Sequence, residues 1–119
     1  MIDQMDFHRL AESLVSWPSA REEHFRIAIS RAYYAAFLAW RELAISSGSD
    51  ADVLRRGSRS VHKDLINWIS KRDVETGRLM NWLFELRKRS DYDIYDYISR
   101  WKAERALEGA RKALERLPR

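Results

Sequence analysis

Two short blocks of the chain combine fixed charges with phenols and could carry chemistry. The first block, residues 30–37, reads Ser-Arg-Ala-Tyr-Tyr-Ala-Ala-Phe and sets one arginine in an otherwise apolar segment. The second block, residues 86–93, reads Leu-Arg-Lys-Arg-Ser-Asp-Tyr-Asp. An arginine on a central, buried helix cannot shed its charge and needs an acceptor. We therefore expect Arg31 to be mostly buried and ion-paired with Asp91.

Basic residues gather in two places, and such clusters can meet the phosphates of RNA or of a nucleotide. Between residues 55 and 72 the chain carries six basic residues against one acid, Asp64. Tyrosine rings nearby could stack on bases. The expected binding residues are Arg55, Arg56, Arg59, Lys63, Arg87, Lys88, Tyr33 and Tyr34. A solvated helix face next to a mobile loop explains the same cluster equally well, so both interpretations stay open.

Residues with catalytic potential are few, and no familiar catalytic or cofactor spacing occurs. Each of the three histidines is expected at the surface or in a helix cap: His8, His24 and His62. His62 keeps a second interpretation, as a proton-transfer group, because it lies inside the basic segment. We expect no metal and no cofactor. The acids that follow the basic run 87–89 are expected to cap the next helix: Asp91, Asp93 and Asp96.

Length and composition predict a single helical domain over residues 1–119. The chain is 45% hydrophobic and 12% aromatic, enough for a real core, and contains only 4 Gly and 2 Pro. No stretch shows sustained period-two alternation, so we predict an all-α, up-and-down bundle of four or five helices. The helices are expected over residues 6–16, 20–46, 60–70, 77–89 and 96–116. Residues 46–60, rich in Ser, Gly and Asp, are expected to form a mobile loop.

The composition also bears on the expected cellular location of the protein. It has no Cys, which excludes disulfides and thiolate metal sites and is compatible with a reducing, cytoplasmic location. No apolar run approaches the roughly 20 residues of a membrane span. The first nine residues lack the apolar stretch of a signal peptide. We expect a cytoplasmic protein with no membrane partner.

Alanines on the helix expected over 20–46 recur every three or four residues and allow another helix to approach closely. Packing inside one bundle explains them, and self-association through the same helix is the alternative. The chain also has 5 Trp, more than one small core usually holds, and aromatic residues are enriched at interfaces. We therefore expect a two-fold homodimer, with helices 20–46 and 77–89 in the contact.

The two blocks, with Val61-His62-Lys63 between them, resemble the three signature blocks of the HEPN family, and more narrowly its short stand-alone prokaryotic branch. The resemblance covers roughly residues 5 to 117. It implies a helical bundle, usually dimeric, and frequent pairing with a minimal nucleotidyltransferase, often as a toxin–antitoxin couple. Many members are ribonucleases in which an arginine, followed a few residues later by a histidine, acts on RNA.

Arg87 matches the arginine of that ribonuclease motif, where arginine would balance phosphate charge and histidine would move a proton. The motif histidine is absent, and Tyr92 lies at its nearest position. A tyrosine with a pKa of about 10 is a poor base at neutral pH, although it can accept a transferred nucleotide. Our hypothesis is a nucleotide- or RNA-binding module with degenerate or absent nuclease activity. The alternatives are an RNA-cleaving toxin in which His62 replaces the missing residue, and a structural dimeric scaffold.

Overall fold

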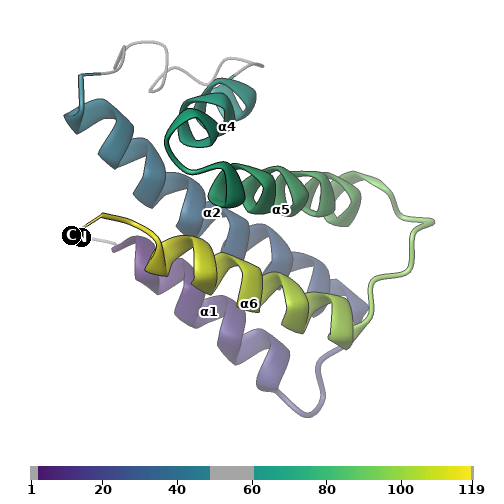
Figure 1. Cartoon of the computed structure of the whole chain (residues 1–119). Coiled ribbons are helices and arrows are strands. Elements are labelled where there is room, and N and C mark those ends of the chain that lie inside the picture. The colour runs from purple at the N-terminus through teal and green to yellow at the C-terminus, as the bar shows by residue number, and fades with distance from the viewer. Residues whose placement is uncertain (1–2, 49–60, 119) are drawn as a thin grey trace.

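The computed structural model describes residues 3–48 and 61–118, and helices account for most of them (Figure 1). They are α1 (Gln4–Ser16), α2 (Glu22–Ser46), α4 (Val61–Arg72), α5 (Val74–Tyr92) and α6 (Arg100–Glu115). These residues contain no strand, so the predicted all-α bundle is confirmed. The predicted mobile loop, 46–60, lies from residue 49 onward outside the described residues. No helix in the described ranges is both long enough and apolar enough to cross a membrane.

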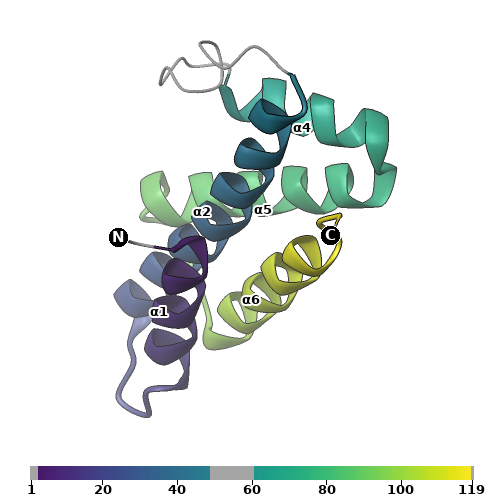
Figure 2. The same cartoon turned by 90° about the vertical axis from the view of Figure 1, so that its left-hand side faces the viewer.

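Helix α2 is the central element and contacts each of the other four described helices. Helices α1 and α6 lie side by side along α2, while α5 passes over α2 and α6 (Figures 1 and 2). Helix α4 pairs with α5 and reaches the C-terminal part of α2 (Figure 2). A helix that is apolar on most of its circumference is expected at such a central position. The first sequence block, which lies on α2, is therefore surrounded by the rest of the chain.

Side-chain caps start two helices at positions that differ from our expectation. The Asp73 carboxylate accepts a hydrogen bond from the Thr76 amide at 3.2 Å, so α5 begins directly after Asp73 and earlier than predicted. The Ser99 hydroxyl accepts from the Lys102 amide at 3.1 Å, so α6 begins later than predicted. The prediction that nearby acids cap α6 was wrong, because all three precede the real cap: Asp91, Asp93 and Asp96.

Small residues allow the helices of this single chain to pack closely. The expected alanine column on α2 is fully buried within the protomer at Ala28, Ala32, Ala35 and Ala36, whereas its last member, Ala39, is half-buried. A Cβ atom on Gly77 of α5 would lie 2.8 Å from the Cα atom of Ser70 on α4, so this approach requires glycine. The indole of Trp40 donates to the Ala113 carbonyl at 2.9 Å and ties α2 to α6. The alanines thus serve packing inside the bundle, and the homodimer stays a prediction.

Candidate functional site

A histidine and a tyrosine from two different helices form the centre of the candidate site. The Tyr33 hydroxyl on α2 lies 2.8 Å from Nδ1 of His62 on α4. The His62 ring also packs on two phenylalanines, with centroids 4.5 Å from Phe37 and 5.0 Å from Phe84. Tyr33 is fully buried, so the prediction that it contacts a base was wrong. Its hydroxyl instead holds the half-buried His62 in place.

Burial sets the protonation state of this pair. Burial, together with the smaller effect of the positive charge of Arg87, lowers the pKa of His62 to about 4. Burial also raises the pKa of Tyr33, because a phenolate would have to exist in an apolar surrounding. At neutral pH the imidazole is therefore uncharged and the phenol is protonated. Since a general base works best with a pKa near the working pH, His62 is poorly matched to that task.

Arg87 and Asp91 form an ion pair next to His62. Nε of Arg87 lies 3.0 Å from Oδ2 of Asp91, and the Ser30 hydroxyl donates to the same oxygen at 3.4 Å. The N–H of Arg87 Nε does not point at the carboxylate well enough for a hydrogen bond. Both side chains are about a fifth to a quarter exposed. The predicted pair of Arg31 with Asp91 was therefore wrong, because Arg87 holds that carboxylate.

Arg31 itself is half-buried and makes no ion pair within the described residues. The arginine of α2 that is buried and ion-paired is Arg26 instead, whose side chain is only 16% exposed. Positions 26 and 31 differ by five residues, or about 140° around a helix, so they face different neighbours. The buried arginine of α2 does have acceptors, but it is Arg26 and not Arg31. The spacing of Glu22 and Arg26, one helical turn apart, was the available signal.

Arg26 holds the end of α5 and the connection that follows it. Its guanidinium donates to the carbonyls of Ser90 and Asp93 at 2.9 Å each, to Arg89 at 3.2 Å, and to Asp96. It also bonds Glu22, which in turn accepts from the Ile98 amide at 3.1 Å. The last carbonyls of a helix lack partners within it, so this arginine acts as a C-terminal cap. The cap fixes the turn of α5 that carries Asp91.

The other predicted site residues lie at different depths. Lys88 is 3.1 Å from Glu85 and lies 4.7 Å from the Phe84 ring centroid, so it borders the His62 cluster. Lys63 is exposed on α4, whereas Tyr34 is half-buried against Phe7. Tyr92, the last residue of α5, is 74% exposed. Three predicted binding residues lie outside the described residues: Arg55, Arg56 and Arg59.

The remaining histidines have structural surroundings. Nδ1 of His24 accepts from the Arg21 amide at 2.9 Å in the cap of α2, as expected for a capping histidine. His8 is buried on α1, against the expectation of a surface or capping position. His62 is therefore the histidine that stands beside Arg87. We call the group formed by Tyr33, His62, Arg87 and Asp91 the Arg87 site.

The Arg87 site contains a guanidinium but no base whose pKa is near neutral pH. A guanidinium can hold a phosphate through paired hydrogen bonds, but here a carboxylate occupies part of it. The described residues contain no group of three or more His, Cys, Asp or Glu side chains that could hold a metal ion. The arrangement thus suits anion binding more than fast proton transfer.

The fold and this site define a helical bundle in which an α2 tyrosine, an α4 histidine and an α5 arginine meet. The family model described as HEPN domain matches residues 18–119, and the chain belongs to the HEPN family. The match includes every residue of the Arg87 site. No curated protein and no solved structure matches the chain.

Proposed function

We propose that this HEPN domain binds a phosphate-bearing ligand, RNA or a nucleotide, at the Arg87 site and cleaves RNA slowly or not at all. One observation carries the proposal: Arg87 lies beside a histidine whose pKa of about 4 leaves it neutral and poorly basic. General acid–base catalysis typically contributes about 10²–10⁴-fold to a rate, and that contribution is missing here. Binding through Arg87 does not require it.

The test combines an RNA-binding assay with an RNA-degradation assay on purified protein. We expect wild type to bind RNA or nucleotide weakly, with an affinity that falls as salt rises. Arg87→Ala should weaken binding. Arg31→Ala should not, because Arg31 lies on α2 outside the Arg87 site. Rapid RNA cleavage by wild type that disappears in Arg87→Ala would refute the proposal. Absence of any binding would favour the scaffold function instead.

A ribonuclease remains the second candidate, and the closeness of His62 to Arg87 is what supports it. In this case His62 would replace the histidine absent from the family motif. A base with a pKa of about 4 would give a cleavage rate that no longer rises with pH above about 5. His62→Gln should then abolish cleavage while circular dichroism shows an intact fold.

We further propose that the chain is a homodimer of the short stand-alone branch, paired with a minimal nucleotidyltransferase in a toxin–antitoxin-type couple in the cytoplasm. The accessible phenol of Tyr92 supports this partnership, because it is free to attack a nucleoside triphosphate. The phenol would lose its proton, bond to the α-phosphorus and release pyrophosphate. Mass spectrometry after co-expression should find the adduct on Tyr92 and not on Tyr95, which is 92% exposed. An adduct on both tyrosines would indicate mere accessibility.

A further inference from the structure

A groove runs between α5 and α6, away from the Arg87 site. Two cavities of about 590 and 290 Å³ lie along it and share Trp82 and Arg105 in their walls, so they form one continuous depression. We call it the α5–α6 groove. Arg87 faces α2 and α4, whereas Trp82 faces α6, five residues or about 140° away on the same helix. The cations lining the groove are Arg78, Arg89, Lys102, Arg105 and Lys112.

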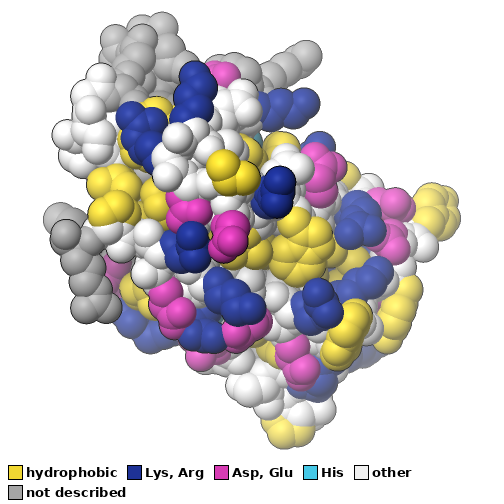
Figure 3. All heavy atoms as spheres, in the orientation of Figure 1, with side chains coloured by type: hydrophobic (Ala, Val, Ile, Leu, Met, Phe, Trp, Pro, Cys, Tyr) yellow, Lys and Arg dark blue, Asp and Glu magenta, His cyan; other side chains and the backbone are white. Residues whose placement is uncertain are grey.

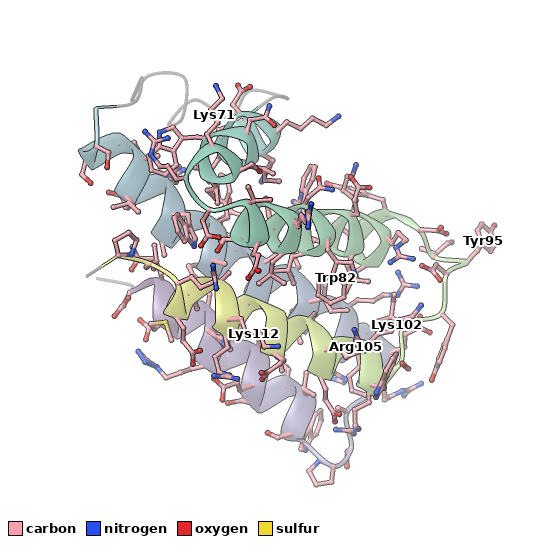
Figure 4. All side chains as sticks on the ribbon, viewed as in Figure 1. Lys71, Trp82, Tyr95, Lys102, Arg105 and Lys112 are labelled. Carbon is pink, nitrogen blue, oxygen red and sulfur yellow. The ribbon has the colours of Figure 1, made fainter. Side chains whose placement is uncertain are left out.

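Two indoles give the α5–α6 groove its apolar surface. Trp82 is 37% exposed, and its ring would lie 3.1 Å from a Cβ atom on Gly109, so the glycine lets the indole lie against α6. Trp101 is 62% exposed, and the Arg105 guanidinium lies 4.8 Å from its ring centroid. Figure 4 shows Trp82 reaching from α5 toward α6, where Arg105 and Lys102 project. Exposed indoles present a large flat surface on which a flat ligand can stack.

The charge of the groove is strongly one-sided. Three of its cations form no ion pair among residues 3–48 and 61–118: Arg78, Arg105 and Lys112. The other two share Asp96 at 3.7 and 3.8 Å. The groove acid Glu108 is already bound by Arg111. Figure 3 shows a hydrophobic patch over α5 and α6 with several basic side chains, and some acidic ones, at its border.

We propose that the α5–α6 groove binds single-stranded nucleic acid, with bases stacked on Trp101 and Trp82 and phosphates held by the unpaired cations. Base stacking on aromatic side chains next to a positive track is how proteins hold single strands without reading sequence. An acidic peptide would use the cations but has no need of two exposed indoles. A second copy of this chain, groove against groove, would bring like charges together. The inference does not depend on the proposed function of the Arg87 site, because the two surfaces share no residue.

The experiment measures binding of a short fluorescent single-stranded RNA by anisotropy over a range of salt concentrations. Trp101→Ala should lower the affinity about fivefold or more and leave the salt dependence unchanged, because it removes stacking alone. Arg105→Ala should reduce the slope of log affinity against log salt by about 0.7, the value for one lost phosphate contact on a single strand. Lys71→Ala, an exposed lysine on α4 far from the groove, is the control and should change neither quantity (Figure 4).

The same measurements separate this inference from the proposed function. Loss of affinity in Trp101→Ala but not in Arg87→Ala supports the groove and counts against binding at the Arg87 site. Loss in Arg87→Ala with unchanged binding in Trp101→Ala overturns the groove. Polyglutamate that binds as tightly as the RNA, with the same dependence on Trp101, also overturns it, because an acidic peptide would then fit equally well. Light scattering that shows Trp101→Ala converting a dimer to a monomer would assign the groove to a second copy instead.

Discussion

Replacing Arg26 by methionine tests whether one buried guanidinium holds the end of α5 in place. The arginine donates to four backbone carbonyls in and after the last turn of that helix. Methionine has a similar length and fills the same space but donates no hydrogen bond. Arg31→Met is the matched control, because Arg31 lies on the same helix and makes no ion pair in the described part of the chain.

The magnitude follows from which carbonyls water can reach. The contacts to Arg89 and Asp93 are exposed, so water replaces the lost donor there. The contacts to Ser90 and Asp96 are partly buried, and each carbonyl left without a donor costs about 1–3 kcal/mol. Arg26→Met should therefore lower the free energy of unfolding by about 2–6 kcal/mol. In a chain of this size that corresponds to a melting temperature lower by roughly 10–25 °C. Arg31→Met should stay within about 1 kcal/mol of wild type.

Thermal and urea unfolding followed by circular dichroism measure both variants. A third variant, Arg26→Lys, keeps the charge but offers a single ammonium, which cannot serve four spread carbonyls. It should fall between wild type and Arg26→Met. Equal melting temperatures for Arg26→Met and Arg31→Met would refute the reasoning, because the capping contacts would then carry no net stability.

Three further perturbations have definite expected outcomes. Folding lowers the pKa of His62 from 6.5 to about 4, so the stability that neutral His62 gives the folded state is complete above pH 6.5 and is lost as the pH falls toward 4. The free energy of unfolding of His62→Gln should therefore depend less on pH than that of wild type between about pH 6.5 and 4. Gly77→Ala should destabilise by about 1–3 kcal/mol in urea unfolding, since the new Cβ atom would collide with Ser70 and outweigh alanine's helix preference. Asp91→Asn should strengthen phosphate and RNA binding several-fold by anisotropy, because it releases Arg87 from a competing carboxylate.

Each of these perturbations has a control or a contradicting outcome. His8 also has a pKa lowered by burial, so His8→Gln should reduce the pH dependence separately and additively. A more stable Gly77→Ala protein would mean that α4 and α5 can move apart without cost. Asp93→Asn changes the same charge on an exposed residue outside the Arg87 site and should leave binding nearly unchanged. Equal gains from Asp91→Asn and Asp93→Asn would show that only net charge matters.

The helical bundle could be predicted from the sequence because periodicity and the scarcity of glycine and proline are local properties. The starts of α5 and α6 were less accessible, since several polar residues near each start could serve as a cap. Asp73 and Ser99 do so in the folded chain. Of the three aspartates that also suit the role, Asp91 lies in the last turn of α5, and Asp93 and Asp96 lie in the connection that follows it. Only the path of that connection, which Arg26 determines, decides among them.

The residues of the candidate site could be predicted from the sequence, but the partner of each residue could not. Arg87, Asp91 and His62 were all identified from residue type, but their partners are chosen by how α2, α4 and α5 cross. The groove between α5 and α6 was missed altogether. Its signals were a glycine inside an amphipathic helix and tryptophans beyond the needs of the core, and only the second was noticed. The role of Gly109 cannot be predicted without knowing that the Trp82 ring packs against it.

The three histidines show why the chemistry of a residue type cannot be assigned without long-range packing. In the sequence His8, His24 and His62 share one expectation, a surface or capping position, and only the basic neighbours of His62 set it apart. In the folded chain one is buried on α1, one caps α2, and one is held by a buried phenol beside a guanidinium. The protonation state of an imidazole depends on solvent access and nearby charge. Both are set for His62 by α2 and α5, whose contacting residues lie more than twenty positions away along the chain, so its role follows from the fold rather than from its neighbours in sequence.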